Sequence, residues 1–226
     1  MHAFGEGIWT VAAPLKFRGI QVNTRMTVCQ LADGGLAVIG PVQYSKELAA
    51  CVDLIGEVRA ILAPNLMHHL YVGDWIDAYP GARSFAAEGI GAKRPELSFS
   101  ATLGPDYDEF CGEELERITI AGMPKLNESL FVHHRSHTLI ATDFCFHLPD
   151  ARGFAALFAM LTGVKRGVRV EPLFKAWIKD TQAFRESLRP LRGLNIEHLT
   201  MCHHAVVSEG ATAILNDVLD QVGVPR

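Results

Sequence analysis

Side chains that could hold a metal ion stand where three apolar segments of this sequence end. His68 and His69 follow segment 58–63, Asp143 follows 138–142, and His203 and His204 follow 198–201. Imidazole nitrogens and carboxylate oxygens are ligands that Zn²⁺, Fe²⁺ and Mn²⁺ accept. If the three segments are neighbouring strands, their ends meet in one crevice, which is where α/β proteins build their sites. The pattern therefore predicts one centre made of two imidazole pairs and one carboxylate.

The elements that must position these residues begin with a sheet that ends in parallel strands. Apolar runs predict strands at 8–12, 26–31, 36–39, 58–63 and 82–87. Ser45 is expected to open a helix that has Leu48, Val52 and Ile55 on one face, and a second helix is expected over about 69–79. Because strands and helices alternate from residue 36 onward, parallel pairing is favoured there.

The rest of the chain is expected to form a second sheet with helices outside it. Strands are predicted at 117–121, 128–134, 138–142 and 198–201, with a hairpin turn at Arg135-Ser136. Asp150 and Ser208 are expected to cap helices, and Pro172 to begin a helical stretch that reaches residue 188. This order predicts two packed sheets, and we expect residues 1–226 to form one domain.

Composition narrows the class of protein. The 226 residues are 49% hydrophobic and 20% charged, as in soluble globular proteins, and the net charge of −4 gives no basic footprint for nucleic acid. No apolar run reaches the roughly 20 residues that a membrane span needs, and the start lacks a signal-peptide pattern. We therefore expect a cytoplasmic protein with a small-molecule substrate and without nucleic-acid or membrane partners. Its oligomeric state stays open.

The cysteines and serines suggest no chemistry of their own. The five cysteines form no Cys-x-x-Cys pair, so we expect small core residues rather than disulfides or a thiolate zinc site. The sequence has no Gly-x-Ser-x-Gly elbow of the kind that serves many serine hydrolases. His133, His134 and His137 flank the predicted hairpin turn and are expected to face solvent.

The order of these elements and polar strand ends resembles the metallo-β-lactamase superfamily over about residues 8–222. That family's His-x-His-x-Asp-His motif follows a strand and precedes a helix, as 65–73 does here, and its bridging aspartate ends a strand, as Asp143 does. Its last histidine follows the final strand, as His203 or His204 does. The resemblance implies an α/β fold, the four-layer αββα sandwich of the metallo-hydrolase/oxidoreductase kind. The segment Pro64-Asn65-x-x-His68-His69 is similar to an uncharacterised bacterial branch with an altered metal motif.

The sequence departs from the family's full ligand set. Aligned on Gly73, Asn65 and Met67 stand at the first two histidine positions and His69 at the aspartate. Aligned on the adjacent histidines, His68 stands at the aspartate and His69 at the last histidine. Segment 120–128 replaces the family's Thr-Pro-Gly-His, with only Asn127 or Glu128 as a polar substitute. A site with two metal ions is therefore not expected.

The resemblance implies a site that holds at most one ion. We expect the metal ligands to be His69, Asp143 and His204, because three protein ligands and one open position suffice for catalytic zinc. Residues that orient these ligands, or that position water or substrate, are expected to be Asn65, His68, Glu128 and His203. Asn65 could instead simply cap the following helix. The cofactor is then one Zn, Fe or Mn ion, or none if the imidazoles only bond to one another and to the acid.

Two functions are compatible with these residues. One is a metal-dependent hydrolase with a degenerate site and an unknown substrate, in which the ion polarises a carbonyl or phosphoryl oxygen. The alternative is a non-catalytic protein that has lost the metal site and binds a small molecule or a partner. Redox chemistry at iron is a weaker third possibility, because the carboxylate-rich ligand set that favours it is missing.

Overall fold

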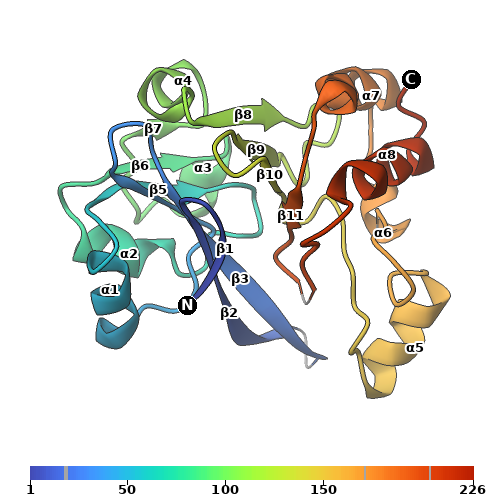
Figure 1. Ribbon diagram of the computed structural model, residues 1–226, viewed down its shortest axis with the longest axis horizontal. Coiled ribbons are helices and arrows are strands. Elements are labelled where there is room, and N and C mark those ends of the chain that lie inside the picture. The colour runs from blue at the N-terminus through green and yellow to red at the C-terminus, as the bar shows by residue number, and fades with distance from the viewer. Residues whose placement is uncertain (18–19, 171, 204) are drawn as a thin grey trace.

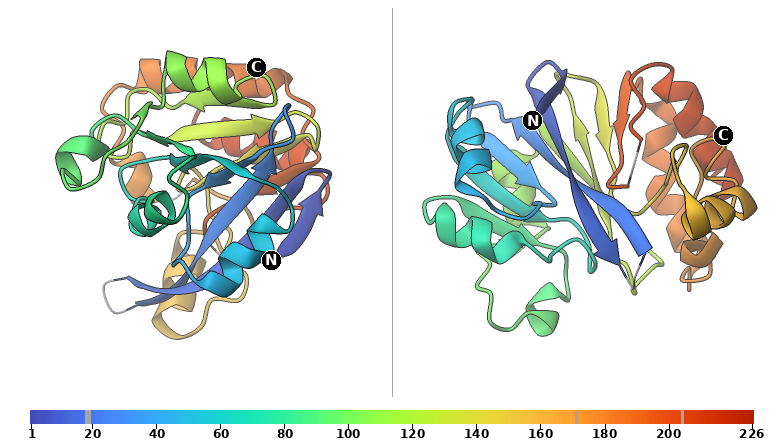
Figure 2. Two further views of the ribbon diagram at one scale, coloured as in Figure 1. Left: turned by 90° about the vertical axis from the view of Figure 1, so that its left-hand side faces the viewer. Right: turned by 90° about the horizontal axis from the view of Figure 1, so that it is seen from below.

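Two β-sheets lie against each other between two groups of helices in the computed structural model (Figure 1). The structure describes residues 1–17, 20–170, 172–203 and 205–226. Seen from below, the strands occupy the middle and the helices the two outer sides (Figure 2). This arrangement confirms the αββα sandwich expected from the sequence.

Seven strands form the first sheet, in chain order. They are β1 (His2–Gly5), β2 (Ile8–Phe17), β3 (Ile20–Gln30), β4 (Leu36–Ile39), β5 (Val58–Ala63), β6 (Arg83–Ala86) and β7 (Ala101–Thr102). Strands β1 to β4 pair antiparallel, and β4 to β7 pair parallel. The parallel half was expected, whereas β1 and β7 were not. The helices of this half are α1 (Lys46–Asp53), α2 (Val72–Ala78) and α3 (Ile90–Lys93).

Alternate residues of these strands enter different cores, because successive side chains point to opposite faces. Val38 and Ile61 pack with Val52 of α1 and Trp75 of α2. Their neighbours in the strands, Ala37 and Leu62, lie in the core between the sheets, together with Phe131 and Ile140 of the second sheet. Burial on both faces explains why β4, and β5 apart from Arg59, are continuous apolar runs in the sequence.

Only some of the helices start where the sequence predicted. Ser45 caps α1 as expected, its Oγ accepting from the Leu48 N–H at 3.1 Å. Helix α2 begins at Val72 rather than near 69, because the chain first makes a turn around Asn65. Asp150 and Ser208 cap no helix, and the helices expected there start only after further turns of the chain.

Four strands form the second sheet, in the order β11-β10-β9-β8. They are β8 (Leu115–Thr119), β9 (Ser129–His133), β10 (Thr138–Ile140) and β11 (His198–Thr200). Helix α4 (Pro105–Cys111) connects the two sheets, and its Tyr107 and Cys111 enter the core between them. The other helices of this half are α5 (Gly153–Leu161), α6 (Pro172–Lys175), α7 (Thr181–Leu188), the 3-10 turn Arg189–Gly193 and α8 (Ala211–Gln221). Leu130, Leu139 and Leu199 pack with Leu188 and Leu215 in the outer core.

The helical stretch expected from residue 172 to 188 is interrupted. Helix α6 ends at Lys175, and α7 starts anew after Asp180, whose carboxylate accepts from the Ala183 N–H at 2.9 Å. The sequence signal for this second start, an Asp before a helical segment, is ordinary capping chemistry. No helix in the described parts of the chain is both long and apolar enough to cross a membrane.

One of the hairpin histidines is not exposed. His133 is fully buried, and its ring bonds to Ser136 Oγ at 2.7 Å and to the Gln30 carbonyl at 3.0 Å. The expectation that it faces solvent was wrong, because its register in β9 turns it toward β3. His134 and His137 are exposed, as expected.

Candidate metal centre

The pairing of β10 with β11 brings Asp143 and His203 together. These strands are parallel, and the last paired residues are Ile140 and Thr200. Asp143 and His203 each lie three residues beyond that pair. Because parallel strands in register end at the same edge, both side chains reach the same side of the sheet. Register thus sets His203 opposite the acid.

The segment after β5 brings the third residue from the other sheet. Leu66 N–H donates to the Leu126 carbonyl, and Ser129 N–H donates to the Pro64 carbonyl, both at 2.9 Å, so this segment is bound to the start of β9. Asn65 is fully buried, and its Oδ1 accepts from the N–H groups of Met67 and His68 at 2.8 Å each. This turn directs the His68 side chain toward Asp143.

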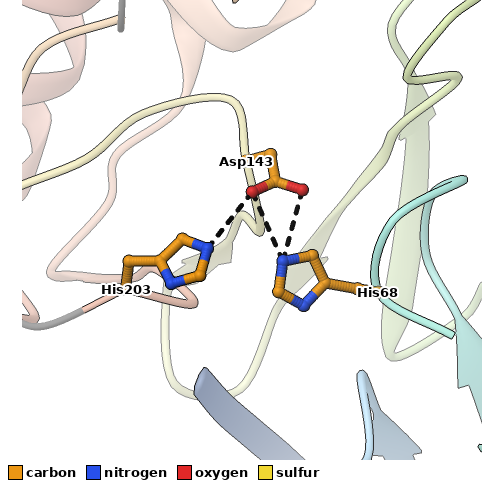
Figure 3. A group of neighbouring side chains, drawn as sticks. All are labelled: His68, Asp143 and His203. Atoms are coloured by element: carbon orange, nitrogen blue, oxygen red, sulfur yellow. Dashed lines mark hydrogen bonds and ion pairs between the residues drawn. The ribbon is translucent and has the colours of Figure 1, made fainter. Parts of the chain in front are cut away.

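His68, Asp143 and His203 converge as one group (Figure 3). His68 Nε2 lies 3.2 Å from Asp143 Oδ2 and 3.3 Å from Oδ1, and His203 Nε2 lies 3.4 Å from Oδ1. Potential ligand atoms of the three residues all lie within 4.8 Å of one another. The Asp143 side chain is 3% exposed, those of His68 and His203 10% and 17%. A small ligand would therefore meet the imidazole edges first.

The charge of Asp143 and the charges of the two imidazoles depend on one another. Burial opposes ionisation of Asp143, but the imidazoles of His68 and His203 outweigh it and hold the pKa of the carboxyl well below its ordinary value. Burial likewise opposes the charged form of His68, yet Asp143 and Cys202 raise the pKa of this imidazole well above its ordinary value. The group therefore holds an ionised carboxylate, which is the form that binds a cation.

Asn65 and Glu128 hold the carboxylate in place. The Asn65 amide donates to Asp143 Oδ2 at 2.9 Å and to Thr142 Oγ1 at 2.8 Å. The fully buried Glu128 carboxylate accepts from the backbone N–H of Thr142 at 2.7 Å and of Asp143 at 3.1 Å. Burial, reinforced by Asp143, raises the pKa of Glu128 to about 7. Glu128 thus binds backbone and is not aimed at a ligand.

His69, expected as a ligand, lies elsewhere. Its Nδ1 is 3.1 Å from an Arg94 guanidinium nitrogen, which also donates to the His69 carbonyl at 3.0 Å. Burial, together with the charges of Lys93 and Arg94, lowers the pKa of His69. The reason is the turn around Asn65, which sends adjacent side chains in different directions. His204, the other expected ligand, lies outside the described residues.

Sequence reasoning missed two features that support the histidines. His203 Nδ1 lies 2.6 Å from the backbone carbonyl of Asn23 in β3. His68 Nδ1 lies 3.3 Å from the thiol of Cys202, a buried residue that the sequence suggested only for the core. The signal available for Cys202 was its place beside His203. The carbonyl of a strand carries no sequence signal at all.

The three side chains fit one divalent cation. A metal bonded to nitrogen and oxygen at about 2.0–2.2 Å in tetrahedral geometry sets neighbouring ligand atoms about 3.4 Å apart. Asp143 Oδ1 lies 3.3 Å from His68 Nε2 and 3.4 Å from His203 Nε2, which is close to that spacing, and all three ligand atoms lie within 4.8 Å of one another. Two imidazoles and one carboxylate also match ligand sets known for catalytic zinc and for non-haem iron. The residues could therefore hold a metal, whose identity the donor set leaves open.

A comparison with protein-family models finds one match. The model described as "Domain of unknown function (DUF4336)" matches residues 5–155, which include His68 and Asp143 but not His203. No curated protein matches the sequence at a significant level.

Solved structures with this fold are similar over nearly the whole chain. A metallo-β-lactamase from Pontibacter korlensis has a TM-score of 0.65 at 11% identity, with 98% of this chain and 97% of that one covered. One from Erythrobacter litoralis has 0.63 at 12%, covering 97% and 95%. The metal-soaked flavodiiron core of Flv1 from Synechocystis sp. PCC6803 has 0.67 at 13%, covering 96% and 59%. These likenesses show a metallo-β-lactamase-like fold.

Proposed function

This chain belongs to the DUF4336 family, a domain family of unknown function, and we propose that it is a metal-dependent hydrolase with a single metal ion held by His68, Asp143 and His203. The observation that carries the proposal is the convergence of two imidazole Nε2 atoms on one buried carboxylate at the ends of strands from both sheets. This set replaces the expected His69, Asp143 and His204. Zn²⁺ fits the donors, and Fe²⁺ or Mn²⁺ are the alternatives.

The residues of the site would have different roles in binding the metal and the substrate. Asp143 supplies the negative charge, and Asn65 and Glu128 fix it through its side chain and its backbone. His68 and His203 present the more exposed edge, where a small substrate approaches. A bound divalent ion would act as a Lewis acid toward a carbonyl or phosphoryl oxygen and lower the pKa of a coordinated water to about 7.

A second ion is not part of the proposal. Asn127, one of the two polar substitutes in segment 120–128, donates through its side-chain amide to the Glu88 carbonyl at 2.9 Å. The other, Glu128, binds the backbone of Thr142 and Asp143. Among the described residues, Glu128 does not belong to the group of potential ligands.

One observation favours a second candidate, a non-catalytic binding protein. Asp143 already forms ion-pair contacts with both imidazoles, and its own remaining contacts go to Asn65 and to Glu128. The charge of Asp143 is then balanced by the imidazoles without a metal ion. This is expected of a site that keeps its architecture after losing its metal. The site would then bind a small molecule or a partner without turnover.

Hydrolysis assays separate the two candidates. Protein loaded with Zn²⁺, Fe²⁺ or Mn²⁺ is tested on thioester, phosphodiester and lactone substrates, with metal-stripped protein as control. Activity should be lost in His203→Ala and Asp143→Asn but kept in the matched control His69→Ala, whose ring faces Arg94. Absence of turnover in loaded wild-type protein would favour the binding protein. Turnover in stripped protein or in His203→Ala that equals the turnover of metal-loaded wild type would refute the proposed site.

A further inference from the structure

Strand β3 extends past its partner β4 and reaches the candidate metal centre. β2 pairs with β3 along its whole length, but in the described chain β4 pairs only with Thr27 to Gln30. Asn23 and Arg25 lie beyond that pairing. Because carbonyls two residues apart in a strand point to the same edge, both can serve the same neighbour. That neighbour is the segment 201–203, which follows β11.

The first of these carbonyls determines which nitrogen of His203 carries a proton. A carbonyl oxygen can only accept, so the 2.6 Å contact between Asn23 O and His203 Nδ1 requires a proton on Nδ1. In the neutral imidazole the lone pair then lies on Nε2, the atom that is 3.4 Å from Asp143. The backbone of β3 thereby selects the tautomer that a metal needs.

The second carbonyl acts on His68 through the Cys202 thiol. Cys202 Sγ lies 3.5 Å from Arg25 O, which can only accept, and 3.3 Å from His68 Nδ1. A thiol has a single proton. If that proton goes to Arg25 O, the sulfur must accept from His68 Nδ1–H. His68 Nε2 is then the atom left for a ligand, and it faces Asp143 at 3.2 Å.

A further contact holds the two segments together. Arg25 Nε donates to the Met201 carbonyl at 3.1 Å, next to Cys202 in the chain. Cys202 itself is 2% exposed. A thiol so enclosed is poorly placed to attack a substrate, but it is well placed to hold a ring.

We propose that Cys202 is a positioning residue, which links His68 Nδ1 to the Arg25 carbonyl and so presents His68 Nε2 to the metal. The inference rests on the proposed metal centre, since its purpose is to orient a ligand. Partners of this kind orient metal-bound histidines, and their loss typically weakens metal binding by about 10–100-fold. Asn23 O performs the same task for His203 without a side chain.

Zinc binding by full-length variants tests the proposal. Cys202→Ala should raise the zinc dissociation constant by about 10–100-fold. Cys202→Ser, which keeps a donor and an acceptor, should restore most of the affinity. The matched control Cys29→Ala removes a fully buried thiol from the core between the sheets and should leave the affinity unchanged. Equal affinities of Cys202→Ala and wild type would overturn the proposal.

Nuclear magnetic resonance of ¹⁵N-labelled histidine side chains provides a readout that is independent of activity and of metal. His68 Nδ1 should carry a proton in wild-type protein, with or without zinc, and this proton should exchange faster with solvent in Cys202→Ala. An unprotonated Nδ1 in wild type would overturn the inference even if zinc binds. If wild type binds no zinc, the proposed function fails, whereas faster exchange of the Nδ1 proton in Cys202→Ala still shows that Cys202 holds the His68 ring.

Discussion

Replacing Asn65 with alanine should destabilise the protein severely, because this one side chain joins three parts of the site. It is fully buried, accepts from the N–H groups of Met67 and His68, and donates to Asp143 and Thr142. Loss of a side chain that accepts from backbone N–H groups, as a helix cap does, costs about 1–2 kcal/mol, and loss of a hydrogen bond to a charged group costs about 1.5–3 kcal/mol. We expect the free energy of unfolding to fall by about 2.5–5 kcal/mol in total.

Equilibrium unfolding in urea measures this change on metal-stripped protein. Asn65→Asp separates the two contributions, because it keeps the oxygen that accepts from Met67 and His68 but sets a second carboxylate beside Asp143. Two adjacent carboxylates raise the pKa of one of them in the folded state. The folded protein then binds more protons than the unfolded one, so Asn65→Asp should gain stability relative to Asn65→Ala as the pH falls from about 7 to about 5. A loss under about 0.5 kcal/mol in Asn65→Ala, which is typical of surface substitutions, would refute this reasoning.

Two further predictions concern packing in the half of the fold that holds the second sheet. Gly122 has a φ of +71°, and a Cβ there would lie 2.1 Å from the Asp180 carbonyl, so Gly122→Ala should lower the melting temperature strongly, at a cost of about 2–4 kcal/mol. Gly81→Ala, with open space around it, is the control, and equal melting temperatures of the two variants would contradict the expected clash. Burial lowers the pKa of His133 below its ordinary value, so its contribution to stability is complete above about pH 6.5 and is lost as the pH falls below that value. In urea unfolding, the loss of unfolding free energy in His133→Gln relative to wild type should therefore become smaller as the pH falls from about 7 to about 5. A loss that stays constant over this range would contradict the prediction.

The sequence predicted the layers of the fold better than the side chains of the site. Strands β4 and β5 have the expected bounds, because continuous apolar runs between turn signals have few other solutions. Short strands such as β1 and β7 carry too little pattern to be found alone. Both depend on pairing with a neighbour, which a local pattern does not report.

The choice between adjacent histidines depended on geometry that the sequence does not express. His203 is selected by the register of β10 with β11, and His68 by the two N–H groups that Asn65 binds. A shift of one residue in the turn after Asn65 would present the His69 ring instead of the His68 ring. Asp143 needed no such choice, since no other acid follows β10 closely. The contribution of β3 arises from backbone carbonyls, which every residue possesses.

The most direct test of the central claim is the zinc content of untagged protein at equilibrium with a small excess of Zn²⁺. We expect about one zinc ion per chain in wild type and in His69→Ala, and almost none in His68→Ala and His203→Ala. An equal loss in His69→Ala and His203→Ala, or no zinc in wild type, would contradict the assignment of His68, Asp143 and His203 as the metal ligands.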